Sequence, residues 1–311
     1  MQQTRAQSVE ATRDRTQLAS RMRAIHPLTW ANAFLIGHLI ALTFGLAGLL
    51  IAIPNPELWA DSEMGVRAYD FGMTYAGSLH IIFGAAAMFA WGVATIGMRK
   101  TAIFFGAAVP ISLGSELLGT SIGEPFGNYA YTSFLGYKIL DHVPFSIPLS
   151  WFYVGFATYM IGHVLAARLG VRPLWIYAVA IGGWLLTVWD LVLDPAMAHE
   201  SLPVRFWVWY ETGPYFGMPT QNFIGWTLTA VVFMTVARLL WRSDPPADGV
   251  RLAIWFPLAI YAANIVFASA LSASVDLWVP IMLAVVFGLV PASLVLIRRS
   301  APATPEPAHD R

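Results

Sequence analysis

Three acidic residues within strongly apolar segments are the first candidates for chemistry. Asp190 and Asp194 are the only charges in the stretch PLWIYAVAIGGWLLTVWDLVLDP, and Glu116 lies in SLGSELLGT. Residues four apart share a helix face, so Asp190 and Asp194 should point the same way. A charged carboxylate costs about 2.5–3.5 kcal/mol at the centre of a membrane-spanning helix. Acids placed at such a cost are candidates for a functional site.

The chemistry that these acids predict is general acid–base catalysis. Burial favours the neutral form of a carboxyl group, so we expect at least one of the three to stay protonated at neutral pH. A neutral acid beside an ionised one can deliver a proton while its neighbour takes one up. We therefore expect one aspartate to be a dry, protonated acid and the other a base that holds water. Glu116 should reach the same cavity.

Each acid also has a purely structural explanation. Asp194 precedes Pro195, a position where a helix commonly ends and meets water, and the same explanation could extend to Asp190 one turn deeper. The carboxyl group of Glu116 could instead bond to Ser112 or Thr120 on its own helix face.

Polar and aromatic residues near these acids are candidates for holding a substrate. Glu124 and Glu211 each precede an aromatic–glycine turn in a long loop, although either could be an ordinary solvated residue. The residues expected to bind substrate are Glu124, Asn128, Tyr129, Trp189, Glu211, Tyr215, Asn222 and Trp226.

One group of aromatic residues is denser than a membrane-interface belt requires. It comprises Trp184, Trp189, Trp207, Trp209, Tyr210, Tyr215 and Phe216. Such a group could line a slot for a long apolar ligand, and its π faces could stabilise a carbocation. Belt or core packing is the alternative.

Metal and cofactor chemistry has little support in the sequence. The chain has no cysteine, which excludes disulfides and thiolate sites, and its seven histidines form no H-x-x-H-H or H-x-x-x-H cluster. We expect the histidines of the apolar segments, His38, His80 and His163, to be packed and hydrogen-bonded, and we expect neither metal nor cofactor.

The composition indicates the elements that must position these residues. Of the 311 residues, 57% are hydrophobic and 12% are charged, against about 25% charged in a soluble domain. Mean hydropathy is +0.61. The net charge of zero gives no reason to expect a nucleic-acid partner. We predict an all-α, polytopic transmembrane helix bundle with spans at about 31–53, 75–98, 101–120, 149–168, 173–193, 221–241, 252–271 and 277–297.

The basic residues predict an orientation for this bundle. Only Arg67, Lys138 and Arg205, 3 of the 18 basic residues, fall on the side away from the N-terminus. By the positive-inside rule both termini are cytoplasmic. We expect a cytoplasmic tail over 1–24, one membrane domain over 25–299 and a disordered tail over 300–311. Loops 54–74, 121–148 and 194–220 should cap the opposite mouth, near the non-cytoplasmic leaflet of the cell membrane.

Several blocks in this order resemble a known family. The stretches SELLGTSIGEPFGNYAYTSFLG, VPFSIPLSWF, DLVLDPAM and GPYFGMPTQNFIGW are similar to the integral-membrane carotenoid 1,2-hydratases, over about residues 105–230. The resemblance implies that water is added across the terminal double bond of a ψ-end carotenoid, leaving a tertiary alcohol, without a redox cofactor. It also implies a long apolar carotenoid, water and membrane lipid as partners. It assigns no catalytic residue and indicates no oligomeric state.

Two other functions are compatible with the acids. A transporter or lipid-binding protein could use them as a proton relay. A prenyl-lipid transferase would bind Mg²⁺ through a D-x-x-x-D motif, a spacing that Asp190 and Asp194 have, but basic partners for a diphosphate are scarce on their side.

Overall fold

The chain folds as an all-α bundle whose helices cross the membrane several times. The computed structural model describes residues 29–297, so the predicted tails 1–24 and 300–311 lie outside the described residues. Eight helices are long and apolar enough to span a bilayer: Thr29–Ala52, Glu63–Ile96, Met98–Ile122, Ser146–Leu169, Leu174–Ala198, Thr220–Trp241, Trp255–Ala273 and Trp278–Leu296. The predicted spans are confirmed, except that the second begins earlier and the fifth ends later.

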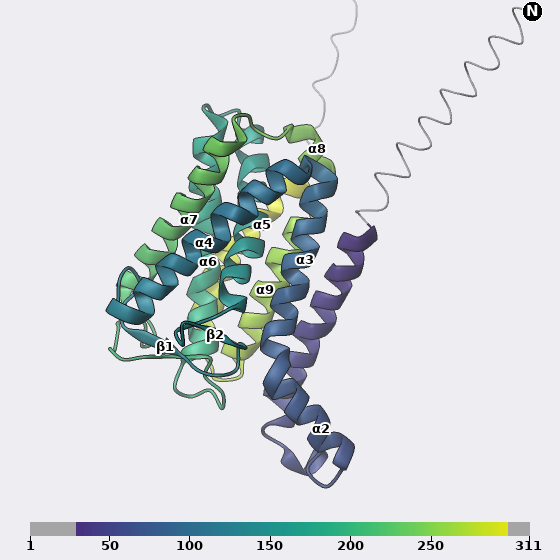
Figure 1. Cartoon of the computed structure of the whole chain (residues 1–311), viewed down its shortest axis with the longest axis vertical. Helices are drawn as coiled ribbons and strands as arrows, with labels where there is room; N and C mark the ends of the chain where they lie inside the picture. Colours follow the sequence, from purple (N-terminus) through teal and green to yellow (C-terminus); the bar gives the residue numbers. More distant parts are fainter. Residues whose placement is uncertain (1–28, 298–311) are drawn as a thin grey trace, which may run out of the picture.

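These spans carry the element labels of Figure 1. The helices are α2 (Glu63–Phe71), α3 (Gly77–Ile96), α4 (Met98–Ile122), α5 (Ser146–Leu169), α6 (Leu174–Ala198), α7 (Thr220–Trp241), the short α8 (Ala247–Leu252), α9 (Trp255–Ala273), α10 (Trp278–Ala284) and α11 (Val290–Ser293). Short π-helical segments join α2 to α3 and α10 to α11, so each pair forms one rod.

The second span begins earlier than predicted. Hydropathy did not indicate its first turns, because they are polar. Ser62 caps the helix by accepting a hydrogen bond from the backbone N–H of Gly65 at 3.3 Å, and Arg67 pairs with Glu63 at 2.8 Å. Capping and a pair four residues apart both stabilise a helix that hydropathy alone misses. The predicted loop 54–74 is therefore largely helical, and α2 projects beyond the rest of the bundle (Figure 1).

The fifth span ends later than predicted because α6 continues through a proline. Pro195 has no N–H for the carbonyl of Leu191, and the hydroxyl of Tyr215 donates to that carbonyl instead, at 2.8 Å. Asp194 consequently lies inside the helix and is 3% exposed. The explanation that Asp194 marks the point where the helix meets water is wrong.

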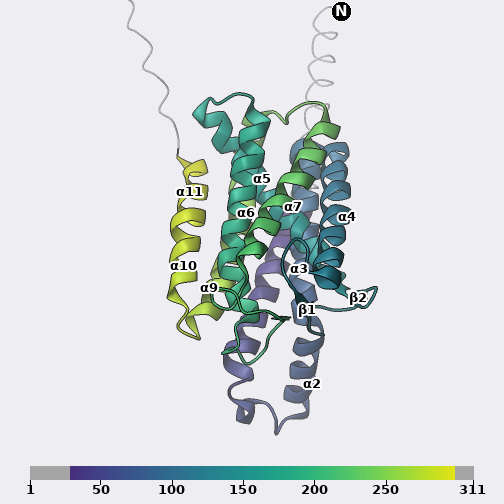
Figure 2. The same cartoon turned by 90° about the vertical axis from the view of Figure 1, so that its left-hand side faces the viewer.

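Helix α5 forms the centre of the bundle and is buried along nearly its whole length. It packs along α6, and α3, α4 and α9 complete its surroundings. The backbones of α5 and α6 come close because Gly162 and Gly182 face the partner helix: a Cβ on Gly162 would lie 2.6 Å from the carbonyl oxygen of Ala178. The helix Thr29–Ala52 lies at one edge of the bundle in Figure 1, and α10 lies at an edge in Figure 2.

Two pairs of short strands lie in the long loops at one end of the bundle, and one of these pairs joins two loops. Strand β1 (Tyr129–Tyr131) pairs antiparallel with β4 (Trp207–Trp209), and β2 (Lys138–Ile139) pairs with β3 (Val143–Pro144). Figure 1 shows β1, β2 and α2 at the same end. The prediction that these loops gather at one mouth is confirmed.

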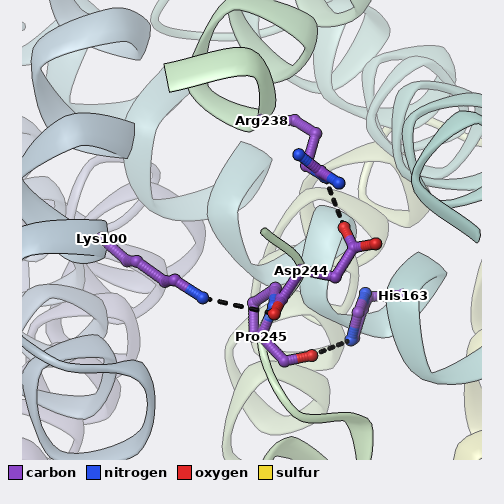
Figure 3. Close-up of polar contacts among 5 residues, drawn as sticks. All are labelled: Lys100, His163, Arg238, Asp244 and Pro245. Carbon is purple, nitrogen blue, oxygen red and sulfur yellow. Dashed lines mark hydrogen bonds and ion pairs between the residues drawn. The ribbon is translucent and has the colours of Figure 1, made fainter. Parts of the chain in front are cut away.

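The opposite end carries a polar cluster that fixes the loop after α7 (Figure 3). Arg238 pairs with the carboxylate of Asp244 at 2.5 Å, and the Lys100 ammonium donates to the backbone carbonyl of Asp244 at 3.3 Å. The His163 ring lies 3.1 Å from the carbonyl oxygen of Pro245. Seven described basic residues lie at this end: Arg99, Lys100, Arg168, Arg172, Arg238, Arg242 and Arg251. Charge therefore separates the two ends of the bundle.

Candidate active site

Glu116 is held by three hydrogen-bond donors from two other elements. Its Oε2 accepts from the hydroxyl of Tyr129 and, at 2.8 Å, from that of Tyr131, while its Oε1 accepts from the indole N–H of Trp151 at 2.8 Å. Alternate residues of a strand face the same way, so β1 presents both tyrosines to α4. The glutamate is 3% exposed. Its three donors suit a carboxylate, which only accepts.

Bonding of Glu116 to its own helix face, the structural alternative, is wrong. Ser112 donates to the carbonyl of Val109, and Thr120 donates to the backbone carbonyl of Glu116 rather than to its side chain.

The two tyrosines remain donors over the physiological pH range. Burial, and next the negative charge of Glu116, raise the pKa of Tyr129 and of Tyr131 well above the usual range. Both phenols therefore keep their protons and continue to donate to Glu116.

Asp190 and Asp194 are joined by one amide group. The side-chain Nδ2 of Asn222, on α7, donates to Oδ2 of Asp190 at 2.8 Å and to Oδ2 of Asp194. Asp190 is 0% exposed, and its Oδ1 has no hydrogen-bond partner among the described residues. The two carboxyl groups thus share one donor in a dry environment.

Asp194 and Glu116 line one cavity of about 60 Å³, enough for several water molecules. Asp190 lies behind it, next to Asn222. Five tryptophans form much of the wall: Trp151, Trp189, Trp207, Trp209 and Trp226. Trp151 stacks on Trp226 at 3.9 Å between ring centroids, and Trp189 meets Trp226 edge-on at 5.7 Å. The acids therefore face an aromatic chamber.

The structure brings together seven of the predicted site residues: Glu116, Tyr129, Trp189, Asp190, Asp194, Asn222 and Trp226. It places the other four elsewhere. Glu124 and Asn128 are exposed: Glu124 accepts from Gln221 at 3.0 Å, and the backbone N–H of Asn128 donates to the exposed Glu211 at 2.8 Å. The hydroxyl of Tyr215 donates a hydrogen bond to the carbonyl of Leu191. These four residues shape the loops and the end of α6 rather than the cavity wall.

The aromatic group expected to line a slot is divided between two environments. Trp189, Trp207 and Trp209 line the cavity, whereas Trp184 is 54% and Tyr210 72% exposed. Sequence position alone does not separate them, because neighbouring aromatic residues point in different directions.

Most residues that line the cavity were not predicted as site residues, and Tyr131, Trp151 and Asn264 are examples. Tyr131 could have been found from the Y-A-Y alternation of β1, which matches the period of a strand. Trp151 and Asn264 carry no local signal, because only the packing of α5 and α9 against the other helices brings them to the cavity.

The three histidines of the apolar segments are packed and hydrogen-bonded, as predicted. Nδ1 of His38 lies 2.7 Å from the carbonyl oxygen of His80, and Nδ1 of His80 lies 3.2 Å from that of Ala76. His163 contacts Pro245 at the other end. Among residues 29–297, no group of three or more His, Asp or Glu side chains is arranged to hold a metal ion.

Comparison with known proteins identifies the family. Residues 76–291 match the family described as carotenoid biosynthesis protein. The chain is 27% identical over 259 residues to a bisanhydrobacterioruberin hydratase from Haloarcula japonica, covering 80% of each chain. No solved structure matches the chain. This protein therefore belongs to the carotenoid biosynthesis protein family.

Proposed function

We propose that this protein is a carotenoid hydratase that adds water across the terminal 1,2 double bond of a ψ end. One observation carries the proposal: Asp194 and Glu116 line the same buried aromatic cavity, and Asp190 stands directly behind Asp194. The hydratase relative supports the reaction class.

The aspartate pair is the proposed source of the proton. Two neighbouring buried carboxyl groups that share one donor resist double ionisation, so one proton is held between them. Asp194 lines the cavity and transfers this proton to the less substituted carbon of the double bond. Asp194 is thereby left as a carboxylate, and the positive charge that forms on the substrate balances its new negative charge. The double-bond electrons form the new C–H bond, which leaves a tertiary cation.

Glu116 is the proposed base for water. Asp190 does not line the cavity, so the water-holding role that the sequence suggested for an aspartate passes to Glu116. Its carboxylate orients a water molecule, which attacks the tertiary cation through oxygen and loses a proton to Glu116. The proton returns to the aspartate pair through the water of the cavity. The product is the 1-hydroxy carotenoid.

The tryptophans are proposed to protect the cation. The π faces of an aromatic wall attract a positive charge. The large tryptophan side chains also limit the access of solvent water to the cation. None of the described residues that line the cavity is Lys or Arg, which disfavours a transferase that must bind a diphosphate.

Expression in a lycopene-producing host tests the proposal. Extracted pigments should gain the mass of one water for each hydrated end, in proportion to the membrane-inserted protein. An unchanged pigment profile, with the protein present in the membrane, would overturn the hydratase assignment.

A further inference from the structure

A second, larger cavity lies beside the acids. Its volume is about 330 Å³, and its walls come from the helix Thr29–Ala52, from the α2–α3 rod and from the loop after α6. Phe44, Trp59, Tyr69 and Phe206 are among its lining residues, and none of the described lining residues is Asp, Glu, Lys or Arg. This cavity, which we call the slot, suits an apolar ligand.

The slot meets the smaller cavity that Asp194 and Glu116 line, which we call the acid cavity. His80, Met197 and Phe267 line both, so these three side chains form a neck between them. A chain that occupies the slot and passes the neck arrives at Asp194 and Glu116.

A buried hydrogen-bond network holds the neck in place. Tyr153 donates to Asn264 at 2.7 Å, and Asn264 lies 3.2 Å from Nε2 of His38, whose other nitrogen contacts the backbone of His80. The His80 ring also stacks on Phe267 at 5.7 Å between ring centroids. The neck is therefore an ordered constriction.

The outer end of the slot opens toward lipid. Phe44, Ile51 and Leu58 line the slot and are also 43%, 54% and 66% exposed. The helix Thr29–Ala52, which carries Phe44 and Ile51, lies at the edge of the bundle in Figure 1. A molecule dissolved in the bilayer can thus approach sideways, without passing through water.

We propose that the slot binds the polyene chain of the carotenoid and presents one end of it to the acids. The inference rests on the proposed hydratase function and adds where the rest of the substrate lies. Pockets for drug-sized ligands span about 300–1,000 Å³, so this slot is at the small end of that range. A carotenoid is longer than such ligands. The slot accordingly holds the part next to the reacting end, and the far end stays in the bilayer.

Gly45 offers a direct test, because a Cβ there would lie 3.8 Å from Cε2 of Phe267, in ordinary contact, beside the neck. Gly45→Phe places a large side chain in the slot. Gly106→Phe is the matched control: Gly106 is exposed on α4, lines neither cavity, and a Cβ there meets nothing within 4 Å. Gly72→Phe, whose Cβ would lie 3.4 Å from Phe44, replaces Gly45→Phe if that variant does not insert.

Two measurements on each variant separate the slot from the chemistry. The first is the carotenoid that co-purifies per protein from a lycopene-producing host, and the second is the yield of hydrated pigment. Gly45→Phe should lose at least about tenfold in both, equivalent to about 1.4 kcal/mol of binding, while Gly106→Phe stays near wild type. Acyclic and monocyclic carotenoids that share a ψ end should be hydrated within about threefold of each other, since the far end stays in the bilayer.

The outcomes distinguish the two proposals. Wild-type pigment binding and hydration in Gly45→Phe would overturn the slot and leave the hydratase standing. The wild type could instead bind pigment that never gains water, with this bound pigment lost only in Gly45→Phe. That result would support the slot and overturn the hydratase function. A preference above threefold between the two carotenoids would show that the far end is bound too, contrary to the inference.

Discussion

Asn222 donates one amide group to two carboxyl groups, and this sharing determines what the aspartate pair can do. The two N–H groups of this amide satisfy only part of the acceptor capacity of the two carboxyl groups. Glu116, by contrast, has three donors of its own. The buried acids therefore occupy two chemically different environments, which is the arrangement that acid–base catalysis uses.

Replacing either aspartate should remove catalysis and leave the fold. Asp190→Asn and Asp194→Asn keep shape and hydrogen bonding but cannot deliver a proton with similar acidity, so hydration should fall by about 10²–10⁴. Hydrated pigment measured against membrane-inserted protein checks this. Asp70→Asn, at an exposed position in α2, is the control and should retain activity. Near wild-type turnover in both site variants would shift the proton source to another acid.

The tyrosines should act through Glu116. Tyr131→Phe removes one donor from the carboxylate, a bond to a charged group worth about 1.5–3 kcal/mol, so kcat should fall by about 10–150-fold. Glu116→Gln should cost more, because it removes the base itself. Tyr137→Phe is the control, since Tyr137 is 76% exposed. Equal activity in Tyr131→Phe and wild type would remove Glu116 from the proposed step.

At the scale of elements, hydropathy predicted the spans well because each must cover the hydrocarbon core with apolar residues. It missed the two boundaries where hydrogen bonds extend a helix: the capped polar start of α2 and the continuation of α6 through Pro195. The i,i+4 spacing correctly placed Asp190 and Asp194 together. It could not predict Asn222 as their shared donor, because that contact depends on how α7 packs against α6.

Loop residues were the least predictable part of the site. Glu124 and Glu211 stand in Gly- and Pro-rich loops that indicate function. In the folded chain they contact Gln221 and the backbone of Asn128, and thereby brace the loops that carry β1 and β4. Side-chain direction in such loops depends on long-range contacts, which the sequence pattern does not contain.

Tyr215 should matter for the stability of α6 rather than for substrate affinity. Tyr215→Phe leaves the carbonyl of Leu191 without its donor, and the loss of one hydrogen bond costs about 0.5–1.5 kcal/mol. We expect a lower Tm in detergent with an unchanged KM. Tyr177→Phe, on the exposed face of the same helix, should leave both unchanged. A raised KM at wild-type Tm would return Tyr215 to the substrate-binding residues.

At the scale of the whole molecule, two kinds of residue gather at opposite ends. The acids, the tryptophans and the slot lie toward the end that carries β1 and β4, while most described basic residues lie toward the end that carries Asp244. Basic residues favour the cytoplasmic side of a membrane. The acid cavity should then lie near the non-cytoplasmic leaflet, where the slot opens to lipid.

This orientation makes a prediction about topology. Reporter fusions placed after Arg242 and after Arg299 should both report the cytoplasm. Six spans precede the first fusion and eight precede the second, and an even number returns the chain to the side on which it began. A fusion after Lys138, in the loop between β1 and α5, should report the opposite side and serves as the control. If the fusions after Arg242 and Arg299 reported the non-cytoplasmic side and the one after Lys138 the cytoplasm, the bundle would be inverted. The acid cavity would then meet its carotenoid in the cytoplasmic leaflet, with the same chemistry.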